Sequence, residues 1–183
     1  NQLARSIRSH GWTRDLPEKS TLFEKYDDDF FEAYRFILPA YNVRPQEINA
    51  AVGLEQLKKL PRFTEIRRKN LKTFEKIFGN DDRFIIQCEN GKSSSFCFTI
   101  ILNPEFNIKR ELVLLKLKSA KIGHRIITGG CFTRHEVIKY FDYEIQGNLV
   151  NANLAHDRGF FVGNHPFDLS DEINYLYDVL NDI

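Results

Sequence analysis

The stretch Tyr41–Leu60, YNVRPQEINAAVGLEQLKKL, determines how the chain is organised. It opens on a polar loop that contains Asn42 and Arg44. Pro45 then stands at the expected first helical position, because its fixed φ suits a helix start and its missing N–H is not needed there. Apolar residues follow at helical spacing and predict a buried helix: Ile48, Ala51, Val52, Leu54, Leu57 and Leu60. The stretch should therefore hold an amide and a guanidinium still at a helix start, where anions are favoured.

The bulk composition is that of a soluble globular protein. The chain has 183 residues, 42% hydrophobic and 28% charged, and a net charge of +1. A nearly neutral chain does not favour nucleic acid or an anionic membrane, and no apolar run approaches the length of a membrane span. The first residues, NQLARSIRSH, have no apolar signal segment and no initiating Met. We therefore expect a cytoplasmic protein and a fragment of a longer chain.

The three cysteines are too few and too scattered for a disulfide framework or a closed zinc site. Cys88, Cys97 and Cys131 are each expected to be small buried hydrophobes in a reducing compartment. Cys131 invites interpretation as a nucleophile, but no base lies near it in the sequence, and it is the thiolate that reacts.

Hydrophobic periodicity changes near residue 79. Before residue 79, apolar residues at helical spacing predict a short helix at residues 2–9, which ends at Gly11. The central helix is interrupted at Pro61, and a further helix follows and ends at Gly79. Beyond it, strands and helices alternate: strands at 84–88, 96–102, 122–127 and 160–162, and helices at 109–120, 149–158 and about 170–180. We predict a domain boundary near residue 79, where residues 1–79 are the end of a larger domain with connecting helices and residues 80–183 form a small α+β domain with helices on one face of a mostly antiparallel sheet.

Polar residues that could read an anion lie in four places. His10 and Arg14 share a loop and could bind phosphate or carboxylate, or simply pair with Asp15. Asn42 and Arg44 precede the central helix. On the 122–127 strand His124 and Arg125 point to opposite faces, so only one can face a given cleft. His165 is a turn residue that could contact a ligand. No metal-ligand spacing or glycine-rich phosphate loop is present, and the basic residues at 62–72 are expected to be a solvated helix face.

Several motifs, in order, resemble one family. They are RSHGW at 8–12, YNVRP at 41–45, GLEQLKKL at 53–60, the Arg67–Arg68 pair and GFFVGNH at 159–165. Together they resemble the C-terminal half of the DegT/DnrJ/StrS family of pyridoxal-phosphate-dependent sugar aminotransferases and dehydratases. With YFDY at 140–143, they are most similar to the branch that contains the GDP-4-keto-6-deoxymannose 3-dehydratases. The resemblance implies an α/β fold of the type I, aspartate-aminotransferase-like class.

The resemblance also implies a function and its residues. Such enzymes use pyridoxal 5′-phosphate (PLP) or pyridoxamine 5′-phosphate on nucleotide-linked 4-keto-6-deoxy sugars for surface polysaccharides, with glutamate as amino donor, and they work as homodimers. It implies that Asn42 reaches the cofactor phosphate in the partner's site, that His10, Arg14 and Arg44 line the substrate pocket, and that Arg125 and His165 approach from the small domain. The catalytic Lys or His would lie upstream of residue 1, so the chain alone is expected to be inactive.

Two features limit the resemblance. Gly129-Gly130-Cys131 stands where the family is expected to have Gly-Asn, and three dispersed cysteines disfavour the iron–sulfur type of 3-dehydrase. An alternative remains that the chain is a non-catalytic binding or dimerisation module that shares only the fold.

Overall fold

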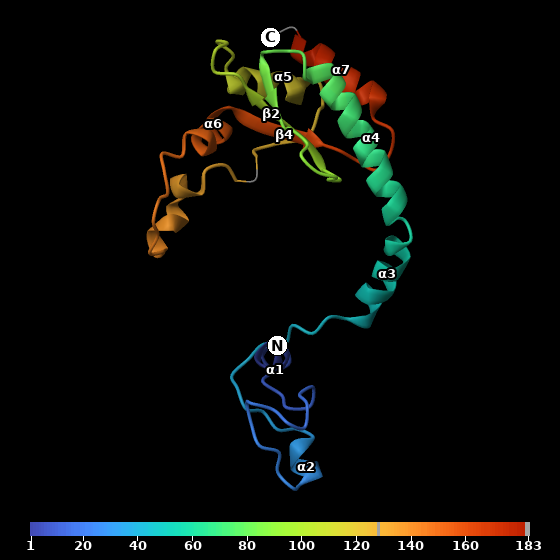
Figure 1. Cartoon of the computed structure of the whole chain (residues 1–183), viewed down its shortest axis with the longest axis vertical. Helices are drawn as coiled ribbons and strands as arrows, with labels where there is room; N and C mark the ends of the chain where they lie inside the picture. Colours follow the sequence, from blue (N-terminus) through green and yellow to red (C-terminus); the bar gives the residue numbers. More distant parts are fainter. Residues whose placement is uncertain (128, 182–183) are drawn as a thin grey trace. The chain divides into compact units, whose positions relative to one another are not determined.

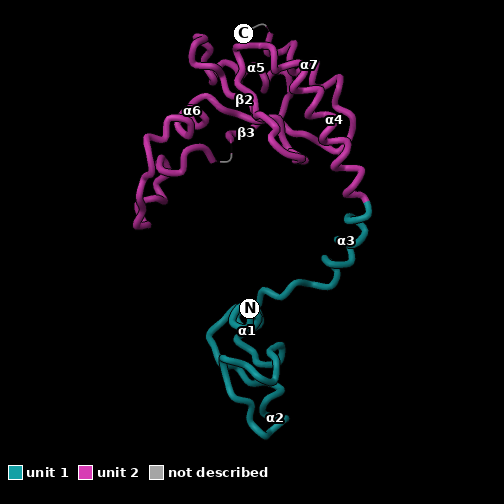
Figure 2. Tube along the Cα trace, in the orientation of Figure 1, with its two compact units in different colours: residues 1–58 teal, residues 59–183 magenta. Residues whose placement is uncertain are grey.

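The computed structural model describes residues 1–127 and 129–181 and divides them into two compact units, Asn1–Lys58 and Lys59–Ile183 (Figure 2). The elements can be followed in Figure 1. No helix among the described residues is both long and apolar enough to cross a bilayer. The predicted domain boundary near residue 79 stays a prediction.

The first unit contains little regular structure. Its helices are α1 (Gln2–Ile7), α2 (Asp29–Glu32) and α3 (Glu47–Leu57). Two isolated antiparallel bridges, Ser9 with Asn42 and Trp12 with Phe36, tie its loops together. Helix α3 begins two residues later than Pro45 predicts, because Gln46 is in the extended conformation of an N-cap.

Helix α3 departs from the sequence prediction in its exposure. Every residue of α3 is exposed in this chain, and Ile48, Leu54 and Leu57 each keep more than 60% of their surface accessible. The prediction of a buried helix is therefore wrong within the first unit, because none of that unit's other described elements covers the apolar side chains. The interruption predicted at Pro61 does occur: α3 ends at Leu57, and Pro61 lies in the first turn of the next helix.

The second unit is a sheet covered by helices. Helix α4 (Leu60–Phe78) ends at Gly79, as predicted, and leads to β1 (Phe84–Ile86) and β2 (Cys97–Leu102). The elements that follow are α5 (Arg110–Ser119), β3 (His124–Arg125), the 3₁₀ turns η1 (Phe132–Arg134) and η2 (Glu136–Tyr140), α6 (Val150–Arg158), β4 (Gly159–Gly163) and α7 (Ser170–Asn181).

The sheet has the order β1-β2-β4-β3, and all three pairings are antiparallel. Phe98 and Ile100 of β2 pair with Val162 and Phe160 of β4, and these four side chains share one buried face. Side chains of α4, α5 and α7 pack on that face to form the core, including Phe74, Phe78, Val113, Leu117, Ile173, Leu176 and Leu180. The helix-covered antiparallel sheet predicted from the sequence is confirmed.

β1, β2 and β3 are shorter than predicted, whereas β4 is longer by one residue at each end. Only His124 and Arg125 of the 122–127 stretch pair with β4. Ile127 instead places its side chain directly against Gly159, where a Cβ would lie 2.4 Å from it. The cysteine prediction is also only partly right: Cys97 and Cys131 are buried, but Cys88 lies past the end of β1 and is exposed.

Candidate functional site

A tight turn after α1 places His10 at the surface of the first unit. Gly11 has φ +79°, and a Cβ there would lie 1.9 Å from the carbonyl oxygen of Leu38, so only glycine fits. The backbone N–H of Gly11 donates to Ser6, and the Gly11 carbonyl accepts from Ile37. His10 also has positive φ and is exposed, with its ring edge-on to Phe36 at 6.5 Å.

Asn42 lies directly across from this turn. The N–H of His10 donates to Tyr41 at 2.8 Å, and the N–H of Val43 donates to Arg8 at 2.9 Å, so Ser9 and Asn42 face each other as a non-hydrogen-bonded antiparallel pair. The Asn42 side chain is exposed, and within residues 1–127 and 129–181 it has no hydrogen-bond partner. Its amide is therefore available to a ligand.

Arg44 and Arg14 extend the same surface. Arg44 Nη2 donates to Asp15 Oδ2 at 2.8 Å, so Asp15 pairs with Arg44 rather than with His10 or Arg14. Arg14 lies over the ring of Trp12 at 5.2 Å from its centroid. The structure thus brings His10, Arg14, Asn42 and Arg44 into one unit, although they come from two separate stretches of sequence.

An aromatic stack supports the loop that carries Arg14. The Trp12 ring stacks on Tyr34 at 5.5 Å and on Phe36 at 5.8 Å, and its Nε1–H donates to the carbonyl of Ala33 at 3.0 Å. Aromatic contacts of this kind contribute roughly 0.5–1.5 kcal/mol beyond area burial. No local pattern in the sequence could show that Trp12 packs on Tyr34 and Phe36, because the contacts join separate stretches of the chain.

The two candidates in the second unit lie on different sides of its sheet. Arg125 pairs with Phe161, on the face opposite the core, and is exposed. His165 follows β4, stacks on Phe167 at 5.4 Å and lines a pocket on the helix side. The structure does not bring Arg125 and His165 together.

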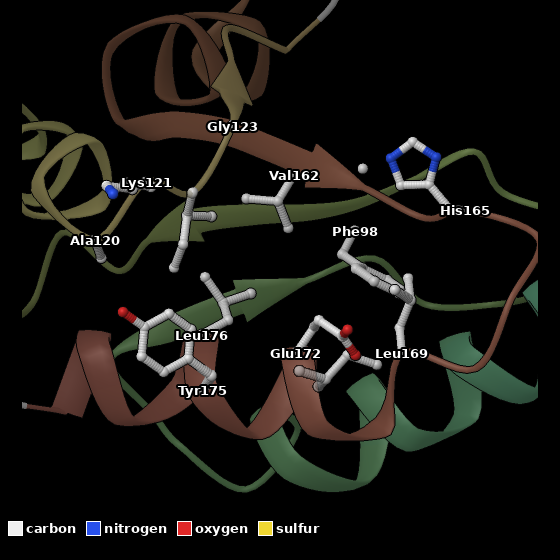
Figure 3. Close-up of a pocket in the computed structure, with 13 residues that line it drawn as sticks. Phe98, Ala120, Lys121, Gly123, Val162, His165, Leu169, Glu172, Tyr175 and Leu176 are labelled. Atoms are coloured by element: carbon white, nitrogen blue, oxygen red, sulfur yellow. The ribbon is translucent and has the colours of Figure 1, made fainter.

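The pocket beside His165 has a volume of about 350 Å³. Figure 3 shows Lys121 and His165 toward its two ends and Glu172 and Tyr175 on α7 along its wall. Its floor is apolar: Phe98, Val162, Leu169, Ile173 and Leu176. One residue before Leu169, hydrogen bonds from Lys69 and Ser170 hold the pKa of Asp168 well below its usual range.

A buried pair of amides fixes the turn that carries His165. Asn70 of α4 donates through Nδ2 to Asn164 Oδ1 (3.1 Å) and to the carbonyls of His165 (3.2 Å) and Phe167 (2.8 Å). Its Oδ1 accepts the backbone N–H of Leu169 at 3.3 Å. Sequence reasoning missed this network; the only available signal was a polar Asn70 on the apolar stripe of α4.

Within residues 1–127 and 129–181, no group of three or more His, Cys, Asp or Glu side chains could hold a metal ion. The sequence profile of the DegT/DnrJ/EryC1/StrS aminotransferase family matches residues 1–180. The chain belongs to this family.

Members of the family with known activity are similar along almost the whole chain. GDP-4-keto-6-deoxy-D-mannose 3-dehydratase of Escherichia coli is 46% identical over 176 residues, which cover 95% of this chain and 45% of that protein. The solved structure of the E. coli enzyme with bound hydrated PLP matches with a TM-score of 0.89 at 45% identity, covering 98% of this chain and 46% of that one. A structure of GDP-4-keto-6-deoxymannose-3-dehydratase with a trapped PLP-glutamate geminal diamine matches with a TM-score of 0.91 at 45% identity, covering 98% and 47%.

The predicted family and fold class are thereby confirmed. The chain has the fold of the corresponding part of the PLP-dependent DegT/DnrJ/EryC1/StrS enzymes. It spans slightly less than half the length of the curated relatives that it matches.

Proposed function

We propose that this chain forms part of a cytoplasmic PLP-dependent enzyme that removes the 3-hydroxyl group of a GDP-linked 4-keto-6-deoxy sugar for surface polysaccharide. The observation that carries this proposal is the match to a GDP-4-keto-6-deoxy-D-mannose 3-dehydratase at 46% identity over 95% of the chain. The other DegT/DnrJ/EryC1/StrS activity, transfer of an amino group to the sugar, is the competing outcome of the tests below.

The loop before α3 fits the phosphate of PLP or pyridoxamine phosphate. The exposed amide of Asn42 has no partner among the described residues, and an amide N–H is a good donor to a phosphate oxygen. When bound, the cofactor supplies an electron sink for bonds that break beside the sugar carbonyl. Asn42 would hold its phosphate from across a homodimer interface, and the rest of the loop would orient the sugar.

The same surface fits an anionic nucleotide sugar. Arg44 uses one N–H on Asp15 and keeps other donors of its planar fork for a phosphate or carboxylate. His10 and Arg14 lie on the adjoining loop and would contact the substrate or the carboxylates of glutamate. Arg125 would approach from the open face of the second unit, and His165 would act from the turn after β4.

The exposed apolar side chains of α3 support a homodimer. Ile48, Val52, Leu54 and Leu57 are each more than half exposed, and a helix with such a face is expected to be covered in the assembled protein. We propose that a second copy contributes to that cover and that the loop with Asn42 therefore completes the partner's site.

Removing Asn42's amide tests the cofactor assignment. In the complete encoded protein, Asn42→Ala should raise the Kd for pyridoxamine phosphate about ten- to a hundredfold, since a hydrogen bond to a charged group is worth roughly 1.5–3 kcal/mol. Asn107→Ala, at an exposed asparagine of the second unit, is the matched control and should leave the Kd unchanged. An unaltered Kd in Asn42→Ala would remove Asn42 from the phosphate site.

A further inference from the structure

Two imidazoles, His135 and His156, hydrogen-bond to the backbone of the turn Gly129–Cys131. His135 Nε2 lies 2.5 Å from the carbonyl oxygen of Gly129 and must donate to it, because a carbonyl only accepts. The backbone N–H of Cys131 donates to Nδ1 of His156, on α6, at 3.1 Å. The two rings meet edge to face at 6.3 Å.

The shape of the turn is built around the His156 ring. Gly130 has φ +73°, and a Cβ there would lie 2.2 Å from His156 Nδ1. Gly130 also donates its N–H to Ile127 at 2.6 Å. Cys131 is buried behind this contact, with its Sγ 3.2 Å from the hydroxyl of Thr133. The absent side chain at 130 lets the ring approach the backbone closely enough to accept the next N–H.

The two histidines respond differently to a proton. His156 Nδ1 accepts the backbone N–H of Cys131, so it must be unprotonated. A proton on Nδ1 would break this hydrogen bond and point the ring N–H at the Cys131 N–H. His135 donates through Nε2 and can keep that bond in either charge state. Only protonation of His156 therefore breaks a contact of the turn.

The charged groups around His156 come from three elements. Arg110 of α5 donates to the His156 carbonyl, and His135 faces the ring from the segment after η1. Asp157 on α6 is bound to Arg134 of η1 at 2.6 Å, and that hydrogen bond lowers the pKa of Asp157. A carboxylate next to the ring thus stays ionised in mild acid, and Arg110 and Arg134 are the cations around it.

We infer that His156 is a positioning residue whose neutral ring fixes the Gly129–Cys131 turn, and that protonation of Nδ1 releases this turn. The turn follows β3, the strand that carries Arg125. The turn also holds the segment after β3, because the Gly130 N–H donates to the carbonyl of Ile127, so its release frees that bond as well. This inference concerns the turn itself and holds whichever sugar chemistry the protein performs.

The Cys131 thiol reports the state of the turn. In the complete encoded protein, the labelling rates of Cys131, Cys88 and Cys97 are measured by peptide mass spectrometry with 4,4′-dithiodipyridine, which reacts with thiols in mild acid. Exposed Cys88 corrects for thiol chemistry, and Cys97, buried in β2, reports loss of the fold. The Cys131 rate relative to Cys88 should rise on the order of tenfold from pH 8 to pH 5.5, the effect of losing one hydrogen bond and leaving its donor unpaired, while Cys97 stays protected.

Two variants separate positioning from packing. His156→Asn keeps an acceptor near the Nδ1 position but cannot be protonated there, so its Cys131 rate should stay low and independent of pH. His156→Phe keeps a ring without an acceptor, so Cys131 should label rapidly at every pH. A pH-independent ratio in the unaltered protein, or an equal acid response in His156→Asn, would overturn the inference. If His156→Phe also exposes Cys97, that variant has lost its fold, and the inference is then tested by comparing the pH dependence of Cys131 labelling in the unaltered protein and in His156→Asn.

Discussion

Replacing Asn70 by alanine should destabilise the second unit without disturbing the first. Asn70 is 1% exposed and makes four hydrogen bonds through its side chain. Two of the groups that it satisfies, Asn164 Oδ1 and the N–H of Leu169, are in buried hydrogen bonds and would be left unpaired. Each buried polar group left without a partner costs roughly 1–3 kcal/mol, so the two together should lower the free energy of unfolding by about 4 kcal/mol.

Urea unfolding followed by far-UV circular dichroism measures this loss. With a slope of about 1–3 kcal/mol per molar urea, the midpoint of the second unit should fall by about 1.3–4 M. Fluorescence of Trp12, the single tryptophan of the chain, reports the first unit and should keep its midpoint. Thr73→Ala, which removes an exposed hydroxyl one turn further along α4, is the control and should change stability by less than about 0.5 kcal/mol. A loss below about 1 kcal/mol in Asn70→Ala would refute the view that the amide pair holds the turn after β4.

Three smaller perturbations follow from local geometry. In the isolated chain, where α3 is uncovered, Gly53→Ala should stabilise α3 by about 0.5–1 kcal/mol, measured by thermal unfolding, because a Cβ at this helical site meets nothing within 4 Å. Gly130→Ala should lower the free energy of unfolding more than Gly129→Ala, because both glycines have positive φ but only a Cβ at 130 clashes with the ring of His156. Equal losses in urea titrations would contradict this. Asp81→Asn should cost about 1–2 kcal/mol at pH 7. Hydrogen bonding to Arg83 lowers the folded-state pKa of Asp81, so its contribution is present above pH ~4 and lost as the pH falls through the lowered folded value, below which the two proteins should have the same stability.

Local sequence signals predicted the elements of the second unit well. Helix α4 ends before Gly79, and the apolar run at 96–102 forms a strand that pairs with a neighbour on each side. Both features were predictable because a helix-ending glycine and an apolar run are signals that lie within a few residues of sequence. The end of β3 was not predictable, since it depends on Ile127 meeting Gly159, a contact between distant segments. The burial of α3 was predicted wrongly, because an amphipathic pattern shows that a face needs a cover but not which chain provides it.

In the candidate site too, the features set by local sequence were predictable and the contacts between distant residues were not. Asn42 and Arg44 were recognisable from their place before a helix, and the resemblance to the family supplied their roles. The Asp15–Arg44 ion pair joins residues 29 positions apart, so no local pattern could choose it over a pair with His10 or Arg14. The contacts of His156 with the Gly129–Cys131 turn span about 25 residues and became visible only in the folded chain.

Product stoichiometry separates the possible activities of the complete encoded protein. With GDP-4-keto-6-deoxymannose, PLP and glutamate, loss of the 3-hydroxyl must release one ammonia and one 2-oxoglutarate for each sugar, because the oxygen removed from the sugar balances the conversion of glutamate to 2-oxoglutarate and ammonia. Transfer of the amino group instead keeps the nitrogen in the sugar and releases no ammonia.

The measurement is therefore the molar ratio of released ammonia to released 2-oxoglutarate, together with the mass of the sugar nucleotide product determined by mass spectrometry. We predict a ratio of about one and a sugar nucleotide lighter by one oxygen atom. A ratio near zero with an aminated sugar would contradict 3-dehydration and make the protein an aminotransferase. Absence of both products, with no cofactor bound, would leave the chain a binding or dimerisation module.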